Sequence, residues 1–181
     1  MRRPVTAHKL NVWTRLSRGG FTLIELLVVV GVTALLATLA TDIFLSVTRS
    51  YNKAQVITAI ERAGSTALST MSNEIRNAQS VSPASGNSAT LNIVDKDGVA
   101  VAFAFVAPTT VANGYISRNG SSITNNDFTS GVNVTTGMFT VADSDPPVVK
   151  ITVTVAQAKG IPSRVDYQAA VTMSTTVSLR Y

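Results

Sequence analysis

The feature that most constrains this chain is an apolar stretch near its N-terminus. Residues 21–41 contain one charged side chain, the carboxylate of Glu25. As a helix with a rise of about 1.5 Å per residue, the stretch would be roughly 31 Å long, close to the thickness of a bilayer core. Its Leu, Ile, Val and Phe residues favour insertion by roughly 5 kcal/mol in sum, against a penalty of about 3 kcal/mol for the carboxylate. The stretch is therefore predicted to span a membrane.

The positive charge of the chain is concentrated before this stretch. Residues 1–20 hold five of the 15 basic residues and none of the 10 acidic ones, so the remaining residues carry no net charge. The sequence pI of about 9.9 therefore describes a basic leader, and no nucleic-acid binding is predicted. Basic residues before a span favour a cytoplasmic N-terminus. The chain is expected to cross the cytoplasmic membrane once, with its bulk on the periplasmic or extracytoplasmic side.

Chemically reactive residues are scarce. The chain has no cysteine, and its single histidine, His8, lies in the basic leader. Loss of the leader would remove the residue types that most often act as general base, zinc ligand or nucleophile. Two aspartate-containing loops, at 95–98 and 143–147, could gather oxygens for calcium, but a solvated turn is the simpler interpretation of each. We therefore predict no enzyme, no cofactor and no metal site.

Several interpretations of the N-terminal segment fit these observations. A secretory signal peptide would have its apolar core at residues 26–39 and be cleaved after Ala40. A second interpretation is an uncleaved membrane anchor. An ordinary signal peptide has no use for a carboxylate at the start of its apolar core, because an unpaired charge costs several kcal/mol in hydrocarbon. The position of Glu25 therefore calls for a more specific interpretation.

Residues 19–27, GGFTLIELL, resemble the class III signal of type IV pilins and type II secretion pseudopilins. That signal has a short basic leader, a glycine, a methylatable Phe, and a Thr-Leu-Ile-Glu run that opens an apolar helix. The resemblance implies that a prepilin peptidase cuts after Gly20 and methylates the new amine of Phe21. It also implies that the helix is retained, first as a membrane anchor and then as the core of a filament.

The same resemblance implies a role for the carboxylate. In such proteins the glutamate, here Glu25, pairs with the terminal ammonium of a neighbouring subunit, and a buried charge is tolerable when it is paired. The implied partners are other pilin or pseudopilin subunits, the peptidase, an inner-membrane assembly platform and membrane lipid. The side chains expected to pack in the membrane and in the filament are Leu23, Ile24, Leu26, Leu27, Val30, Leu35 and Leu39.

The helix is predicted to continue to about Gln79. No proline appears from Asp42 to Gln79, and apolar or small residues recur every three or four positions, which indicates one amphipathic face. This face consists of Phe44, Val47, Tyr51, Ala54, Ile57, Ile60, Gly64, Ala67, Met71, Ile75 and Ala78. Of these, Ile57, Ile60, Met71 and Ile75 are expected to pack against a sheet. A Ser-, Pro- and Gly-containing run at 82–87 then ends the helix.

Beyond the helix the periodicity changes to two, which is typical of strands. Strands are predicted at 89–94, 99–106, 115–117, around Ile123, and at 132–141, 148–155 and 167–179. Asp97-Gly98 and Asn119-Gly120 are hairpin signals, and the strand at 99–106, which has no polar face, is expected to be central. The predicted fold class is α+β, with a long N-terminal helix, half transmembrane and half amphipathic, packed on an antiparallel sheet with meander order.

The predicted organisation has four parts: a cleaved leader at 1–20, a transmembrane and filament-core helix at 21–41, its amphipathic continuation at 42–80, and a β-sheet domain at 81–181. Within the family, residues 71–78 and 175–180 resemble the helix end and last strand of J-type minor pseudopilins. The resemblance therefore implies a minor subunit that primes assembly at a filament tip. The alternative is a β-rich adhesion or binding protein, anchored by one span or secreted, that does not polymerise.

Overall fold

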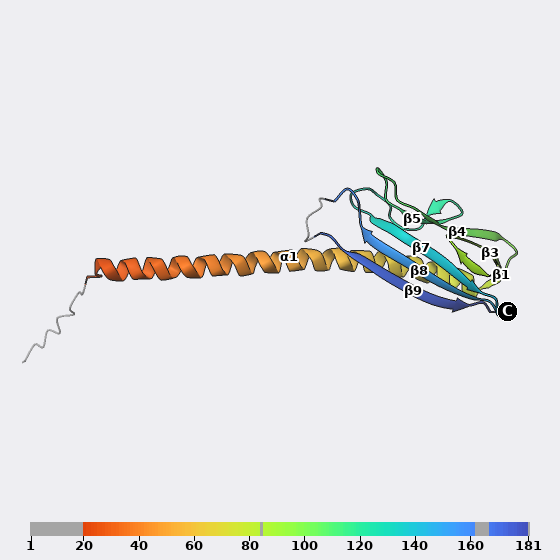
Figure 1. The fold of residues 1–181 in the computed structure, drawn as a ribbon, viewed down its shortest axis with the longest axis horizontal. Coiled ribbons are helices and arrows are strands. Elements are labelled where there is room, and N and C mark those ends of the chain that lie inside the picture. The colour runs from red at the N-terminus through yellow and green to blue at the C-terminus, as the bar shows by residue number, and fades with distance from the viewer. Residues whose placement is uncertain (1–19, 84, 162–166, 181) are drawn as a thin grey trace, which may run out of the picture. The chain divides into compact units, whose positions relative to one another are not determined.

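A computed structural model of the protein describes residues 20–83, 85–161 and 167–180. All of the predicted leader except Gly20 lies outside the described residues. The chain divides into two compact units, Met1–Phe44 and Leu45–Tyr181. The helix α1, Leu23–Arg76, contributes to both units (Figure 1). The predicted membrane span therefore lies in the first unit, and the core of the β-domain lies in the second.

The bounds of α1 follow from local hydrogen bonds at its two ends. The helix was predicted from Phe21 to about Gln79, and it is continuous but shorter at both ends. At its start, the Thr22 hydroxyl accepts the backbone N–H of Glu25 at 3.2 Å, the bond of an N-terminal cap. At its end, Asn77 N donates to Glu74 O at 3.2 Å, and Ala78 already belongs to the first strand. Strand pairing thus ends the helix before the proline does.

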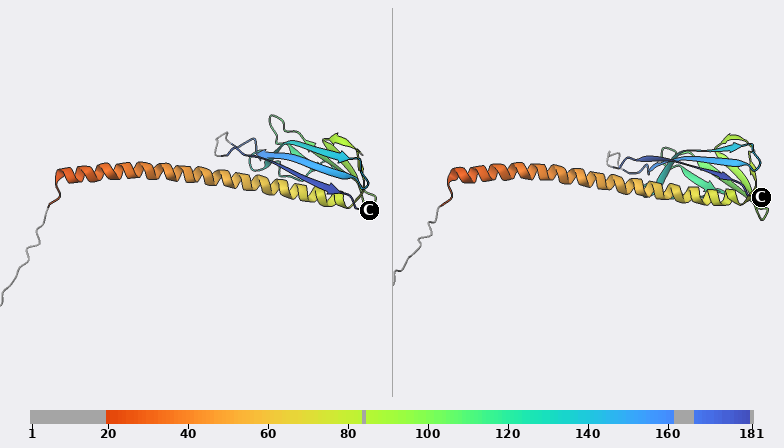
Figure 2. Two further views of the ribbon diagram at one scale, coloured as in Figure 1. Left: turned by 60° about the horizontal axis from the view of Figure 1, so that its bottom comes forward. Right: turned by 90° about the horizontal axis from the view of Figure 1, so that it is seen from below.

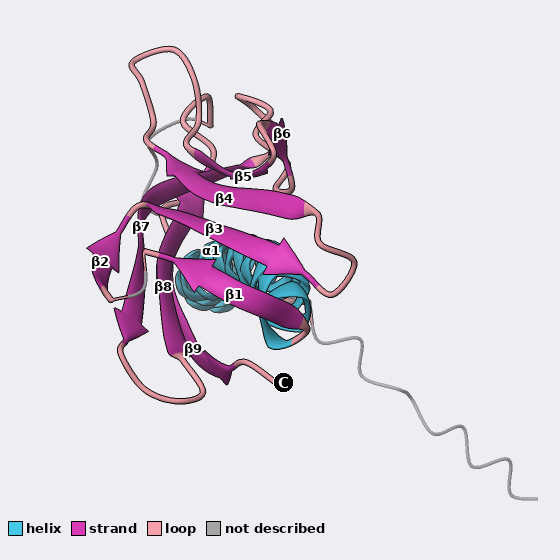
Figure 3. Cartoon of the chain, turned by 90° about the vertical axis from the view of Figure 1, so that its right-hand side faces the viewer, coloured by secondary structure: helices cyan, strands magenta, loops and turns pink. Residues whose placement is uncertain are grey.

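The second unit contains two antiparallel sheets, which Figures 1 and 3 show beside and around the C-terminal part of α1. The first sheet has the order β1-β3-β4-β5-β6 and the second has the order β2-β7-β8-β9. The strands are β1 Ala78–Ser82, β2 Gly86–Ser88, β3 Thr90–Asp95, β4 Ala100–Val106, β5 Tyr115–Arg118, β6 Ser121–Ser122, β7 Val132–Ala142, β8 Val148–Gln157 and β9 Ala170–Ser178. The α+β fold class is confirmed, but the single meander becomes two sheets.

Each sheet gains one strand, β1 or β2, that the sequence did not predict. β1 pairs with β3, with Val81 opposite Ile93, whereas β2 crosses to the other sheet and pairs with β7, with Ser88 opposite Phe139. Both strands are short and rich in Ser, Gly, Gln and Asn, so they lack the apolar alternation that marks a strand. Their conformation is fixed by the partner strand, which is a tertiary effect.

The central position of β4 and both hairpins are confirmed. β4 has β3 on one side and β5 on the other. Asn119 and Gly120 adopt positive φ angles of 49° and 82° between β5 and β6, as a tight hairpin turn requires. Gly98 has a φ of 77° in the turn between β3 and β4. The local turn chemistry therefore sets the register of the first sheet.

The core of the second unit lies between the sheets and one face of α1. The helix buries Ile60, Gly64, Ala67, Leu68, Met71 and Ile75. Large buried partners from the strands include Phe103, Phe139, Ile116 and Ile151. Ile57 is half-buried, and Leu68 was not part of the predicted face. Phe44, Val47 and Tyr51, which continue the same face toward the N-terminus, are exposed.

The end of the chain returns to the end of the helix. Arg180 N donates to Arg76 O at 3.0 Å, and Leu179 N donates to Pro147 O at 3.1 Å. β7, β8 and β9 run alongside the C-terminal part of α1 in all the ribbon views (Figures 1 and 2). The last strand is therefore joined both to its sheet and to the final turn of the helix.

Gly64 marks the closest approach of α1 to β9. A Cβ at this position would overlap Cε of Met173 and lie 3.5 Å from Cγ2 of Val155. The absence of a side chain lets the half-buried Met173 fill the space between helix and sheet. In contrast, a Cβ at Gly31, in the first unit, would meet no atom within 4 Å. The two helical glycines therefore have different structural environments.

We expect Gly64→Leu to lower the free energy of unfolding of the β-domain by about 1–3 kcal/mol, because it overpacks a close contact. Denaturant unfolding of the full chain in detergent, followed by near-ultraviolet circular dichroism, measures the change. Adding Met173→Ala should recover part of the loss, since it frees the space. Gly31→Leu is the matched control and should leave the domain unaffected. Equal stability of Gly64→Leu and the unsubstituted chain would contradict this packing.

Candidate functional site

The N-terminal end of the described chain is non-helical and exposed. Gly20, Phe21 and Thr22 precede the helix, and the Phe21 side chain is 76% exposed. A Cβ on Gly20 would meet nothing within 4 Å, and the glycine needs no positive φ. The fold of the chain itself therefore gives no reason for a glycine at position 20. A requirement for glycine there must come from a molecule that binds this segment.

Glu25 occupies the third position of α1, where its backbone N–H contributes to the helix cap. Thr22 and Glu25 have the spacing Thr-x-x-Glu of a capping box. The backbone N–H of Glu25 donates to the Thr22 hydroxyl, which satisfies one of the free donors at the start of the helix. The sequence analysis missed this role, although the Thr-x-x-Glu spacing before an apolar run was a readable signal.

The carboxylate of Glu25 is favoured by its position but has no partner in the described part of the chain. A negative charge in the first helical turn is stabilised by the positive end of the helix dipole, typically by about 0.3–1 kcal/mol. Among the described residues, no side chain or backbone donor forms a hydrogen bond or ion pair with this carboxylate. It remains available to a group outside the single chain.

The apolar part of α1 is uncovered in the single chain. The helix contains a stretch long and apolar enough to cross a membrane, and none of that stretch is buried. All seven side chains predicted to pack in a membrane or filament are exposed: Leu23, Ile24, Leu26, Leu27, Val30, Leu35 and Leu39. An apolar surface of this length is incompatible with water and must be covered by lipid or protein.

The hydroxyl groups in the apolar stretch are satisfied within the helix. Thr33 donates to Val29 O at 2.9 Å, Thr38 to Leu35 O at 2.8 Å, and Thr41 to Ala37 O at 2.8 Å. Bonds of this kind to the preceding turn let Ser and Thr side chains lie in lipid without an unpaired donor. These threonines therefore do not prevent insertion.

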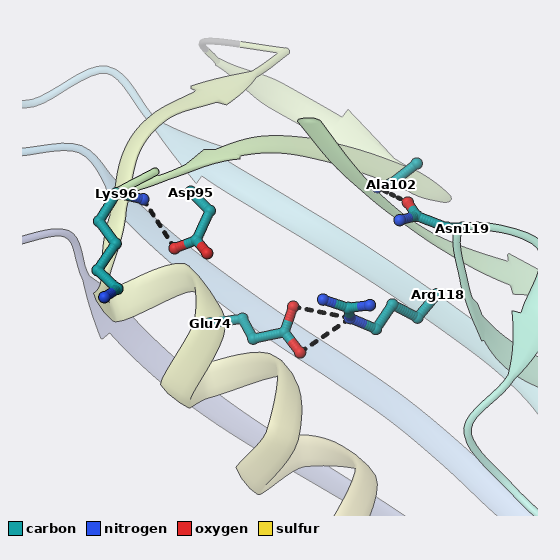
Figure 4. A network of polar contacts seen from close by, with 6 residues as sticks. All are labelled: Glu74, Asp95, Lys96, Ala102, Arg118 and Asn119. Atoms are coloured by element: carbon teal, nitrogen blue, oxygen red, sulfur yellow. Dashed lines mark hydrogen bonds and ion pairs between the residues drawn. The ribbon is translucent and has the colours of Figure 1, made fainter. Parts of the chain in front are cut away.

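The polar groups near the other end of α1 support the fold. Arg118 Nε on β5 donates to both carboxylate oxygens of Glu74 at 2.9 Å (Figure 4). The side chains are 41% and 29% exposed, so this ion pair links helix and sheet without a large stabilisation. Glu74 lies in the segment that resembles J-type pseudopilins, and its observed contact is intramolecular.

The two loops considered for calcium form turns. Asp95 Oδ1 accepts the backbone N–H of Lys96 at 2.7 Å, which orients this carboxylate toward its own turn (Figure 4). In the second loop, the Ser144 hydroxyl donates to Pro146 O at 2.9 Å. Within the described ranges, no three His, Cys, Asp or Glu side chains come together as a metal site would require.

The buried polar side chains are used by the structure. Asn113 donates to Asp127 O at 2.6 Å and accepts the backbone N–H of Lys159 at 2.8 Å, so one amide joins two loops. Asn133 accepts the N–H of Gly114 at 2.9 Å. In the part of the chain that the structure describes, no buried side-chain nitrogen or oxygen lacks a partner. These groups give no indication of a catalytic centre.

The carboxyl of Asp127 has a lowered pKa. Its Oδ1 accepts the backbone N–H and the hydroxyl of Ser130 at 2.7 and 2.8 Å, and those of Thr129 at 2.9 Å each. The bonds from Ser130 and then Thr129 hold the pKa of Asp127 well below its usual 3.8. Since all four donors lie within three residues, the carboxylate caps a turn before β7, and a perturbed pKa here does not indicate an active site.

Comparison with known proteins bears on the N-terminal segment. Residues 15–41 match the family model of the prokaryotic N-terminal methylation motif. This motif is the class III signal peptide of type IV pilins, and the match confirms the resemblance recognised in residues 19–27. It covers Gly20, Phe21, Glu25 and the exposed apolar side chains that follow. No curated protein and no solved structure matches the chain.

The turn capped by Asp127 yields a pH prediction. Because the folded-state pKa is lowered, this carboxylate stabilises the fold at pH values above 3.8, and the contribution is lost as pH falls below that value. Asp127→Asn should lower the denaturation midpoint at neutral pH, and the difference should shrink under acid. Asp97→Asn, which removes an exposed carboxylate 3.9 Å from Lys96, is the control and should change little. A pH-independent effect of Asp127→Asn would contradict the assignment.

Proposed function

We propose, from the premise that the N-terminal methylation motif makes this chain a type IV pilin-like or pseudopilin-like precursor, that it is a minor subunit of a pilus or type II secretion-like pseudopilus. In this role the chain is structural and not an enzyme. The observation that carries the proposal is the motif at residues 15–41 directly joined to an apolar helix that no part of the described chain covers.

The first step is processing by a prepilin peptidase on the cytoplasmic side. Water adds across the Gly20–Phe21 peptide bond, which leaves a Gly20 carboxylate on the leader and a free amine on Phe21. The same class of enzyme then transfers a methyl group from a methyl donor to this amine. The position of both residues outside the helix and their exposure support this step, as does the lack of any reason for Gly20 within the described residues.

The second step is the transfer of α1 from lipid to protein. The apolar side chains anchor the precursor in the cytoplasmic membrane, with the N-terminus inside and the β-domain periplasmic. In the filament the same side chains pack against helices of other subunits, after delivery by an inner-membrane assembly platform. Both environments cover the exposed surface of Leu23 to Leu39, which supports the proposal.

Glu25 makes this transfer selective. Its carboxylate has no partner in the described part of the chain, and the amine freed on Phe21 supplies a positive charge of the right kind in a neighbouring subunit. Pairing removes the cost of a lone charge in an apolar medium. A subunit that docks out of register leaves both charges unpaired, so the pair favours one register. Position at the filament tip is proposed from the resemblance of residues 71–78 and 175–180 to minor subunits.

The mature N-terminus distinguishes the proposed function from its alternatives. Intact-mass analysis of the membrane-extracted protein should show a chain that begins with N-methyl-Phe21. A chain that begins at Thr41 would support a secreted β-domain, and one that retains Met1 would support an anchored protein that never polymerises. Gly20→Leu should block cleavage almost completely, because a bulky side chain hinders approach of the peptidase to the backbone. Normal maturation of that variant would argue against the assignment.

Glu25→Gln and Glu25→Val should be cleaved and inserted but enter filaments about tenfold less, because each leaves the neighbouring ammonium unpaired. Gln preserves the size of the side chain, and both variants keep the backbone N–H that the cap uses. The measurement is the ratio of variant in sheared filaments to variant in membranes. Glu61→Gln, an exposed carboxylate further along α1, is the control. Incorporation of both Glu25 variants at the level of the control would refute the pairing.

A further inference from the structure

The start of α1 is set by one hydroxyl group. In an α-helix each N–H donates to the carbonyl four residues earlier. Leu26 N donates to Thr22 O at 3.1 Å, which is such a bond. The next donor toward the N-terminus, Glu25 N, would in a longer helix use the carbonyl of Phe21, but it uses the Thr22 hydroxyl at 3.2 Å. The side chain of Thr22 therefore substitutes for one further residue of helix.

The Thr22 cap determines whether the Gly20–Phe21 peptide bond, the proposed cleavage site, lies inside or outside the helix. The Gly20–Phe21 peptide bond lies before the helix, and both residues are exposed. Extended peptides are commonly recognised through their free backbone groups, which a helix occupies internally. A helix that began at Phe21 or earlier would involve the Phe21 carbonyl in a helical bond. The cap thus keeps this segment in the form that another protein can bind.

We propose that Thr22 is a positioning residue for cleavage after Gly20. Its hydroxyl caps α1, makes the helix begin at Leu23, and so keeps the Gly20–Phe21 bond outside the helix, where the peptidase can bind its backbone groups. The inference rests on the proposed function and explains why a threonine stands at position 22. Gly20, a poor helix former, acts in the same direction by resisting extension of the helix toward the leader.

The apolar surroundings make the cap more important than it would be in water. An unpaired N–H at the edge of a bilayer has few solvent partners, so it finds an acceptor in the chain. Without the Thr22 hydroxyl, the nearest acceptor for Glu25 N is Phe21 O, reached by adding a residue of helix. Loss of the hydroxyl should therefore draw Phe21 into the helix and lower the fraction of chains in which the cleavage site is non-helical.

The test compares three variants of the full-length precursor in detergent micelles with purified prepilin peptidase. Thr22→Val removes the hydroxyl and keeps the β-branched shape, whereas Thr22→Ser keeps the hydroxyl. Thr33→Val is the matched control, because its hydroxyl bonds to Val29 O and caps nothing. The readouts are the initial rate of leader removal, the cut position by intact mass, and the backbone carbon chemical shifts of residues 20–22 before peptidase is added.

Thr22→Val should be cleaved about threefold to tenfold more slowly, with helical shifts appearing at Phe21 and Thr22. Thr22→Ser and Thr33→Val should match the unsubstituted chain. The proposal is overturned if Thr22→Val is cleaved at the normal rate. It is also overturned if Thr22→Val is slow while its helix still begins at Leu23, or if Thr22→Ser is equally slow, since either result indicates contact with the peptidase. Failure of the unsubstituted precursor to be cut after Gly20 would instead overturn the proposed function, and this inference with it.

Discussion

The apolar surface of α1 must be kept from water. The arrangement of the sheets and the proposed role of the N-terminal segment both follow from what covers this surface. The C-terminal part of the helix meets the requirement within the chain, by packing Ile60, Met71 and Ile75 against two sheets. The N-terminal part has no such cover in the described chain. One helix therefore combines a surface that folding buries with a surface that only lipid or another subunit can bury. The methylation motif lies at the uncovered end, where the proposed cleavage would free an amine beside that surface.

The polar groups of the uncovered part are few, and the structure accommodates each one locally. Its threonines bond to the preceding turn, and the backbone at the start of the helix is capped by Thr22. The carboxylate of Glu25 is the exception, since it is stabilised by its place in the first turn and remains unpaired among the described groups. Because these threonines and the capped backbone have hydrogen bonds, the unpaired carboxylate is the group of this segment that gains most from a positively charged partner. This is the physical basis for proposing that Glu25 fixes the register between subunits.

The sequence predicted those features that depend on local chemistry. The long helix, the six strands β3, β4, β5, β7, β8 and β9, and the turns at Gly98 and Asn119-Gly120 follow from periodicity and turn residues, whereas the strand predicted around Ile123 is the two-residue β6, Ser121–Ser122, which ends before Ile123. It could not predict β1 and β2, because their Ser- and Gly-rich residues become strands only when β3 and β7 pair with them. It also could not divide the helical face into buried and exposed parts. Tyr51 and Ile60 fit the same period, and only the position of the sheets leaves one exposed and buries the other. At the N-terminus, the motif was predicted from the sequence, but the cap at Thr22 was not. The Thr-x-x-Glu spacing signals this cap, in which the backbone N–H of Glu25 donates to the Thr22 hydroxyl.

The hydrogen bond from Arg180 to Arg76 has a mechanical consequence. A pull along α1 reaches the β-domain over the packed part of the helix from Ile60 onward, and the last turn of the helix also holds the end of the chain. Because β7, β8 and β9 run alongside the helix, such a pull acts along the strands and strains many interstrand bonds at once (Figure 2). Strands pulled lengthwise resist separation better than strands opened one bond at a time. Tension applied along the packed part of α1 would therefore load these strands in the direction in which they resist separation best.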